Sequence, residues 1–192
     1  MSCRVNINKN KAIFFDRDGI INETIIKNKV ARSPRNINEF KLNIKIKKYL
    51  EYFKKKNYYN IIITNQPEVK RGLVKKKTVL LFHSQIKKKL PIDKIYVCYD
   101  ISIKSFFRKP NPGMLLKASK DFSINLKKSY FIGDRYKDIY AGNRVKCKTV
   151  YIDYNYNETK PKKYYLYAKQ LIKGLKLVKN DIMKLQNSSY KY

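Results

Sequence analysis

Two carboxylates stand two residues apart, directly after a short apolar run near the start of the chain. The run at 12–15 is followed by Asp16, Arg17, Asp18 and Gly19. On an extended segment, one such carboxylate can serve as nucleophile or metal ligand and the other as general acid and base. Gly19 allows the backbone to bend sharply behind them. This pattern favours catalysis by a pair of carboxylates.

Three further polar segments carry groups that complement this pair. They supply a hydroxyl, side-chain amides, fixed cations and a further carboxylate, and they are Thr64-Asn65-Gln66, Arg108-Lys109 and Gly133-Asp134-Arg135. Mg²⁺ prefers oxygen ligands, and fixed cations offset the charge of a phosphate group. If these segments meet, they predict Mg²⁺-assisted chemistry on a phosphate.

Hydrophobic periodicity predicts the elements that must bring these residues together. Strands are expected near 12–15, 59–63, 94–99, 130–132 and 149–152, and helices near 43–56, 79–90, 111–122 and 138–144. Asn111 would cap the third helix, with Pro112 at its first position. The alternation indicates an α/β fold, with a parallel sheet of about five strands and helices on both faces. Ligands bind at the carboxyl ends of such strands, where Asp16, Thr64 and Asp134 are expected.

The length of 192 residues suits one α/β domain. No repeat or change of composition suggests a boundary, so a single domain over residues 1–186 is predicted, with its core at 11–152. A polar linker leads to an expected C-terminal helix at about 161–185, which Gly174 would interrupt. Residues 187–192 are expected to fray.

The net charge of +31, from 45 Lys and Arg against 14 Asp and Glu, is the outlying number in the composition. Such a surplus suits nucleic acid or an anionic surface. Lys, Ile, Asn and Tyr together make up half of the chain, a bias typical of an AT-rich genome. We therefore interpret most of the charge as compositional and expect no nucleic-acid partner, while a selected binding patch stays open as the alternative.

The cysteines and the hydropathy pattern bear on the cellular setting. Cys3, Cys98 and Cys147 form no CxxC pair, which argues against a disulfide framework or a zinc ribbon. The N-terminus carries no apolar signal region, and no run of about 18 apolar residues occurs. We expect a cytoplasmic protein that is monomeric and does not bind membranes.

The four polar segments resemble, in order and spacing, the motifs of the haloacid dehalogenase superfamily of aspartate-nucleophile phosphatases. The matching stretches within residues 11–152 are FFDRDG, IITN, RKPNPG and IGDRYKD. The finer pattern of DRDGxxN, TNQ and RKPxPGM is similar to the branch of D-glycero-D-manno-heptose 1,7-bisphosphate phosphatases and histidinol-phosphate phosphatases. The resemblance implies a three-layer, Rossmann-like fold with strand order 3-2-1-4-5 and no large cap domain.

The resemblance also implies a catalytic role for matching residues. Asp16 would attack phosphorus and form an aspartyl-phosphate, and Asp18 would protonate the leaving oxygen and later deprotonate water. The phosphate and the rest of the substrate would contact Thr64, Asn65, Arg108, Lys109 and Arg135.

Magnesium is the cofactor that the resemblance implies. Its ligands would be the carboxylates of Asp16 and Asp134 and the backbone carbonyl of Asp18. Asp138 would lie behind them and orient Lys109 or a metal-bound water.

The same resemblance implies a small phosphorylated metabolite as the substrate. The first expectation is heptose 1,7-bisphosphate, losing its 7-phosphate on the way to cell-surface polysaccharide. Three alternatives stay open: histidinol phosphate, a polynucleotide 3′-phosphatase activity or nucleic-acid binding on the same core, and a non-catalytic scaffold.

The sequence departs from this branch in the segment before RKP. Relatives usually carry a zinc-binding loop there, but no His follows Cys98, and Ser105 and Phe107 occupy the positions of a Cys-x-Cys pair. One cysteine cannot complete a tetrahedral site, so we predict no zinc and a shortened loop at 100–107. His83, the only histidine, is expected to pack on a helix rather than take part in catalysis.

Overall fold

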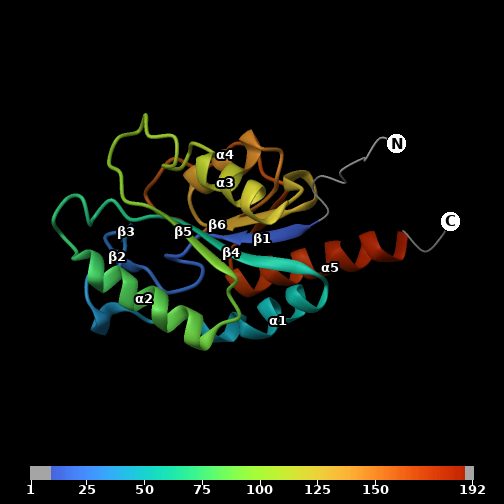
Figure 1. Ribbon diagram of the computed structural model, residues 1–192, viewed down its shortest axis with the longest axis horizontal. Coiled ribbons are helices and arrows are strands. Elements are labelled where there is room, and N and C mark those ends of the chain that lie inside the picture. The colour runs from blue at the N-terminus through green and yellow to red at the C-terminus, as the bar shows by residue number, and fades with distance from the viewer. Residues whose placement is uncertain (1–9, 189–192) are drawn as a thin grey trace, which may run out of the picture.

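The computed structural model describes residues 10–188, and its centre is a parallel sheet of six strands. The strands follow the order β5-β4-β1-β6-β7-β8 across the sheet (Figure 1). Their bounds are Lys94–Cys98, Tyr58–Asn65, Lys11–Phe15, Tyr130–Gly133, Lys148–Ile152 and Leu166–Ala168. The first five confirm the predicted order 3-2-1-4-5, and β8 is an additional strand beside β7.

Within residues 10–188, five α-helices cover the two faces of the sheet and give the predicted three layers. Helices α1, α2 and α5 lie on one face, and α3 and α4 lie on the other (Figure 1). Their bounds are Lys47–Lys55, Lys76–Lys89, Leu171–Ser188, Gly113–Phe122 and Tyr136–Arg144. The 3₁₀ turn Ile44–Ile46 precedes α1, within the segment expected to be helical throughout.

Alternation along β1 explains why this strand needs helices on both sides. Ile13 and Phe15 pack into the core under α1, α2 and α5, whereas Ala12 and Phe14 pack into the core under α3 and α4. All four side chains are completely buried. A strand that is buried on both faces has no polar positions, which is why its sequence is a continuous apolar run.

Helix α2 begins at Lys76, about three residues before its predicted start, and α3 and α4 also begin at other residues than the sequence indicated. Helix α3 begins at Gly113, so Pro112 rather than Asn111 is the capping residue. The amide of Asn111 donates instead to the carbonyls of Ile103 and Ser105, which ties the preceding loop together. Helix α4 begins at Tyr136, two residues earlier than expected.

The C-terminal segment differs most from its prediction. The strand β8 occupies residues 166–168, where helix was expected, and α5 begins only at Leu171. Gly174 lies within α5 and does not interrupt it. A Cβ at this position would lie 2.4 Å from the Cδ1 atom of Ile152, so glycine lets the helix pack closely on the sheet. Positions 187 and 188 belong to α5, and 189–192 lie outside the described residues. None of the helices within 10–188 is long and apolar enough to cross a membrane.

A small antiparallel hairpin follows β1, and the sequence pattern gave no indication of it. It consists of β2 (Ile25–Lys27) and β3 (Val30–Arg32). The 3₁₀ turn Ile37–Glu39 follows it, and Arg32 forms an ion pair of 2.8 Å with Glu39. The hairpin brings Ser33 next to Asp18 at the carboxyl end of β1.

Candidate active site

The site forms where three neighbouring parallel strands end. Asp16 follows β1 and Asp134 follows β6, while Asn65 is the last residue of β4. Lys109 belongs to the loop between β5 and α3 and reaches across to Asp16. The topology therefore brings the four sequence motifs to one edge of the sheet, as predicted.

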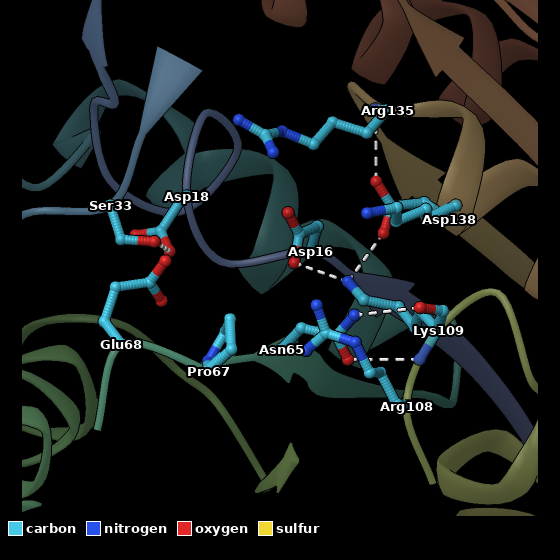
Figure 2. A pocket seen from close by; sticks show the side chains of 11 residues that line it. Asp16, Asp18, Ser33, Asn65, Pro67, Glu68, Arg108, Lys109, Arg135 and Asp138 are labelled. Atoms are coloured by element: carbon cyan, nitrogen blue, oxygen red, sulfur yellow. Dashed lines mark hydrogen bonds and ion pairs between the residues drawn. The ribbon is translucent and has the colours of Figure 1, made fainter. Parts of the chain in front are cut away.

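A cavity opens at this edge, and Figure 2 shows its lining. The residues that line it are Asp16, Asp18, Ser33, Asn65, Pro67, Glu68, Arg108, Lys109, Arg135, Lys137 and Asp138. Two expected site residues are not on this surface. Thr64 is buried and its hydroxyl accepts a hydrogen bond from Gln66, and Asp134 is only 2 % exposed.

Lys109 is the buried cation at the floor of the cavity. Its Nζ atom lies 2.6 Å from Asp16 and 2.6 Å from Asp138 (Figure 2). The same atom donates to the carbonyl of Ile63 at 2.8 Å. Burial alone would lower the pKa of Lys109, but the carboxylates of Asp138 and Asp16 outweigh burial and raise it. Lys109 is therefore a fixed positive charge at neutral pH.

Asn65 holds the backbone of Lys109 in place. Its side-chain amide donates to the Lys109 carbonyl at 3.0 Å, and its side-chain oxygen accepts from the Lys109 N–H at 3.1 Å (Figure 2). This reciprocal pair fixes the loop between β5 and α3 to the end of β4.

The carboxylates of Asp16, Asp134 and Asp138 form a crowded group, which we call the carboxylate cluster. One oxygen from each lies within 4.8 Å of the others. Burial raises the pKa of Asp16 to about 6, because the neighbouring charges of Asp138 and Asp18 add to burial and the charge of Lys109 only partly offsets them. A single lysine does not neutralise three buried carboxylates, so the cluster favours a further cation.

Asp134 is the member of the cluster best suited to bind a cation. Both of its carboxylate oxygens are buried and have no hydrogen-bond partner of good geometry, although the Tyr156 hydroxyl lies close enough to counteract part of the rise in the pKa of Asp134. Burial, followed by the charges of Asp16 and Asp138, raises its pKa well above the ordinary range. A Cβ at Gly19 would lie 2.1 Å from one of these oxygens, so only glycine leaves room beside them. Hard oxygen ligands with this much negative charge fit Mg²⁺.

Asp138 has both carboxylate oxygens occupied by the protein. One contacts Lys109, and the other accepts from the backbone N–H of Arg135 at 3.1 Å, just before α4 (Figure 2). An acidic residue in the first helical turn suits such a bond. Asp138 is therefore placed to hold Lys109 rather than to complete a metal site.

Asp18 lies in a different environment, which we call the Asp18 cage and which consists of Arg17, Asn22, Ser33 and Gln66. Each of the four donates at least one hydrogen bond to its carboxylate, at 2.8–3.1 Å. Burial raises the pKa of Asp18, but the charge of Arg17 and the hydrogen bonds outweigh burial and lower it. Asp18 is therefore a carboxylate in the free protein.

The two other predicted substrate-binding cations are held by different parts of the chain. Arg108 donates to the carbonyl of Asp100 at 2.6 Å. Arg135 donates to the carbonyl of Ala31 at 2.6 Å and forms an ion pair of 3.3 Å with Glu158. Arg135 therefore joins the start of α4 to the hairpin.

The sequence motifs contain Arg17, Asn22 and Gln66 of the Asp18 cage, but no role was predicted for these residues from the sequence alone. Arg17 stands inside the first motif and is completely buried, which is unusual for an arginine. Gln66 directly follows Thr64-Asn65, and its position at the end of β4 was the available signal. Lys137, which lines the cavity, likewise stands inside the fourth motif, whereas Ser33 had no such signal because its position depends on the hairpin.

Comparison with known proteins identifies the family. The model of the polynucleotide kinase 3 phosphatase family matches residues 11–184. A D-glycero-alpha-D-manno-heptose-1,7-bisphosphate 7-phosphatase from Campylobacter jejuni is 38% identical over 139 residues, which are 70% of this chain and 77% of that protein. A D-glycero-beta-D-manno-heptose-1,7-bisphosphate 7-phosphatase from Helicobacter pylori is 34% identical over 149 residues, with coverage of 74% and 83%.

Solved structures agree on the fold. The D,D-heptose 1.7-bisphosphate phosphatase from B. bronchiseptica, complexed with magnesium and phosphate, superposes with a TM-score of 0.72 at 20% identity, over 89% of this chain and 99% of that one. A HAD-like phosphatase from Mesorhizobium loti also gives 0.72, at 21% identity and coverage of 96% and 91%. The chain is a phosphatase of the haloacid dehalogenase superfamily and belongs to the polynucleotide kinase 3 phosphatase family.

Proposed function

We propose that the chain is a Mg²⁺-dependent phosphomonoesterase that removes the 7-phosphate of D-glycero-D-manno-heptose 1,7-bisphosphate through an aspartyl-phosphate. The observation that supports it most is the pairing of Asp16 with Lys109 at 2.6 Å beside the unpartnered carboxylate of Asp134. The relatives from Campylobacter jejuni and Helicobacter pylori, which carry this activity in their names, support the choice of substrate.

Asp16 is the nucleophile in this proposal. An oxygen of its carboxylate attacks phosphorus, and the bond from phosphorus to the sugar oxygen breaks. The attack brings two negative groups together, and Lys109 reduces their repulsion. In this proposal Asn65, which lines the cavity beside Lys109, contacts the transferring phosphoryl group.

Residues of the carboxylate cluster would hold the metal. The carboxylates of Asp16 and Asp134, with the backbone carbonyl of Asp18, are the proposed Mg²⁺ ligands. When bound, Mg²⁺ supplies positive charge that offsets the phosphate and the cluster.

Asp18 moves the protons. The negative charge of an incoming phosphate raises the pKa of a neighbouring carboxyl, so Asp18 is protonated more readily once substrate is bound. It donates this proton to the leaving sugar oxygen. Water then attacks phosphorus of the aspartyl-phosphate and gives its proton to Asp18, the bond between phosphorus and Asp16 breaks, and inorganic phosphate leaves.

A phosphate-release assay with a small set of substrates tests the proposal. The purified chain, with Mg²⁺ and then with EDTA, is given both anomers of heptose 1,7-bisphosphate, histidinol phosphate and an oligonucleotide with a 3′-phosphate. We expect the highest kcat/KM for one heptose anomer, loss of the 7-phosphate in the product spectrum, and no turnover with EDTA. Faster release from histidinol phosphate or from the oligonucleotide would replace the substrate assignment and keep the reaction type.

The cellular setting follows from this function. A sugar-phosphate phosphatase that makes precursors of cell-surface polysaccharide belongs in the cytoplasm. From the sequence we also expect a monomer that binds no zinc. Size-exclusion chromatography and metal analysis of the purified protein test the last two expectations.

A further inference from the structure

The segment 153–165, between β7 and β8, brings two tyrosines to the surroundings of the carboxylate cluster. Tyr154 is half-buried and Tyr156 is only 8 % exposed, and their rings lie 5.7 Å apart. Neither residue belongs to the four sequence motifs. Because the hydroxyl of a buried tyrosine usually finds a hydrogen-bond partner, the groups that these two hydroxyls meet indicate what the segment does.

Tyr154 holds the turn behind the paired carboxylates. Its hydroxyl donates to the carbonyl of Gly19 at 2.9 Å. Gly19 itself lies against Asp134, since a Cβ there would be 2.1 Å from an oxygen of that carboxylate. The same turn carries the backbone carbonyl of Asp18, which is one of the proposed Mg²⁺ ligands. Tyr154 therefore fixes the backbone beside the proposed metal site.

Tyr156 lies next to the carboxylate of Asp134. Among residues 10–188, neither its buried hydroxyl nor the two oxygens of Asp134 have a hydrogen-bond partner of good geometry. The two groups are nonetheless close, because the hydroxyl counteracts part of the rise in the pKa of Asp134. Burial, followed by the charge of Asp134, raises the pKa of Tyr156, so the phenol keeps its proton. A hydrogen-bond donor therefore faces an acceptor.

Neighbouring contacts keep Tyr156 in this position. The guanidinium of Arg135 lies over its ring, 5.9 Å from the centroid, and Arg135 also pairs with Glu158 at 3.3 Å. The backbone N–H of Asn157 donates to the carbonyl of Lys29, in the turn of the hairpin, at 3.0 Å. The residues around Tyr156 are thus tied to the start of α4 and to the hairpin.

We propose that Tyr156 is a positioning residue for Mg²⁺. Its hydroxyl donates to one oxygen of the Asp134 carboxylate and leaves the other oxygen to the ion, while Tyr154 holds the Gly19 turn beside them. Groups behind a metal ligand orient it in this way, and their removal commonly costs about 10–100-fold in metal affinity or activity. The inference rests on the proposed Mg²⁺-dependent function, and it holds whichever phosphate ester is the substrate.

The test measures Mg²⁺ binding without substrate, by calorimetry of the metal-free protein with MgCl₂ alone. Tyr156→Phe removes the hydroxyl and keeps the ring, so the Kd for Mg²⁺ should rise about tenfold. Tyr164→Phe makes the same change at an exposed tyrosine of the same segment. It is the matched control and should leave the Kd unchanged.

Two further measurements separate positioning from a structural role. In EDTA, Tyr156→Phe should melt no lower than the wild type, because it removes a buried hydroxyl that lacks a well-placed partner. In the phosphate-release assay, the Mg²⁺ concentration that gives half of the maximal rate should rise about tenfold. The kcat at saturating Mg²⁺ should stay within about threefold of the wild type, because the hydroxyl acts through Asp134 and does not touch the phosphate.

The outcomes distinguish this inference from the proposed function. A Kd for Mg²⁺ equal to that of the wild type, or a melting temperature in EDTA that falls by several degrees, overturns the positioning role of Tyr156. A wild type that binds no Mg²⁺ overturns the metal site and this role together. Weaker Mg²⁺ binding by Tyr156→Phe, combined with a wild type that does not hydrolyse heptose 1,7-bisphosphate, supports the role and overturns only the choice of substrate.

Discussion

The carboxylate cluster and the Asp18 cage begin two residues apart on the chain, yet their charges are balanced in opposite ways. In the cluster, Asp16 shares one lysine with Asp138 and lies near the unpartnered Asp134, and burial raises its pKa to about 6. In the cage, Asp18 receives a buried arginine and three neutral donors, and its pKa is lowered. Environments that separate the pKa values of two neighbouring carboxyls allow them to take different roles in one reaction.

The two regions also affect stability with opposite signs. A carboxyl whose pKa is higher in the folded protein than in the unfolded chain stabilises the fold at low pH, and this stabilisation is lost as pH rises through the folded value, which is about 6 for Asp16. For Asp18 the folded pKa is the lower one, so its contribution is present at neutral pH and is lost on acidification. Without metal, the cluster weakens the fold at pH 7 and the cage strengthens it.

The largest effect is expected in the cluster, for Asp16→Asn. An amide cannot attack phosphorus, so phosphatase activity should fall by at least about 10⁴-fold. Because the substitution removes one charge from a crowded group, the melting temperature without Mg²⁺ should not fall. Enzyme assays measure the activity, and thermal unfolding in EDTA measures the melting temperature. Glu51→Gln, at an exposed residue that pairs with Lys47, is the control. Activity within about tenfold of the wild type would remove Asp16 from the nucleophile role.

The cage should respond to the loss of a charge in the opposite way. Arg17→Met removes a completely buried cation and leaves Asp18 with neutral donors only. Breaking one partner of a buried ion pair costs about 3–5 kcal/mol, so the free energy of unfolding in urea should drop by about this amount. Arg17→Lys keeps the charge but not the bidentate contact with Asp18, so its free energy of unfolding should drop by less. A wild-type stability for Arg17→Met would mean that the cage does not stabilise the fold.

Much of the fold and most of the site residues could be predicted from local sequence, for a physical reason. Buried parallel strands are continuous apolar runs, and Asp16 and Asn65 stand at the carboxyl ends of two of them, whereas Lys109 is marked only by the RKP motif in the loop before α3. The structure brings them together as expected. The strand order follows once the strands are known.

The remaining parts depend on contacts between segments that are far apart in sequence. The hairpin strands β2 and β3 have three residues each, too few for a periodic signal, and β8 is equally short. Arg17 points inward because it meets Gln66, the residue after β4, at 2.9 Å, in addition to its neighbour Asp18. A charged residue in a motif gives no local sign that its partner lies 49 positions away.

The third expected effect is stabilisation by Mg²⁺, because the ion should offset the excess negative charge of the carboxylate cluster. A ligand at 100 times its Kd stabilises the folded state by about 2.7 kcal/mol. Thermal unfolding with Mg²⁺ should therefore give a melting temperature several degrees higher than with EDTA. Asp134→Asn should lose most of this gain, and in EDTA it should be no less stable than the wild type, because it removes an unpartnered buried charge. Asn22→Asp, which adds a carboxylate to the cage instead, should keep the Mg²⁺-dependent gain if the ion binds at the cluster.

The smallest effect concerns His83, which lies behind the cage. Its Nε2 atom is 3.4 Å from Arg17, and it is 8 % exposed on α2. Burial, followed by the charge of Arg17, lowers the pKa of His83 to about 4. The unfolded chain, with an ordinary histidine pKa near 6.5, takes up the proton first, so acidification from pH 7 to pH 5 should cost about 1–2 kcal/mol of stability through this group. Urea unfolding at the two pH values should show a smaller loss for His83→Gln, which does not titrate. Since Asp16 acts with the opposite sign below pH 6, the comparison is best made in the Asp16→Asn background. Equal losses with and without His83→Gln would show that burial and Arg17 do not hold His83 neutral.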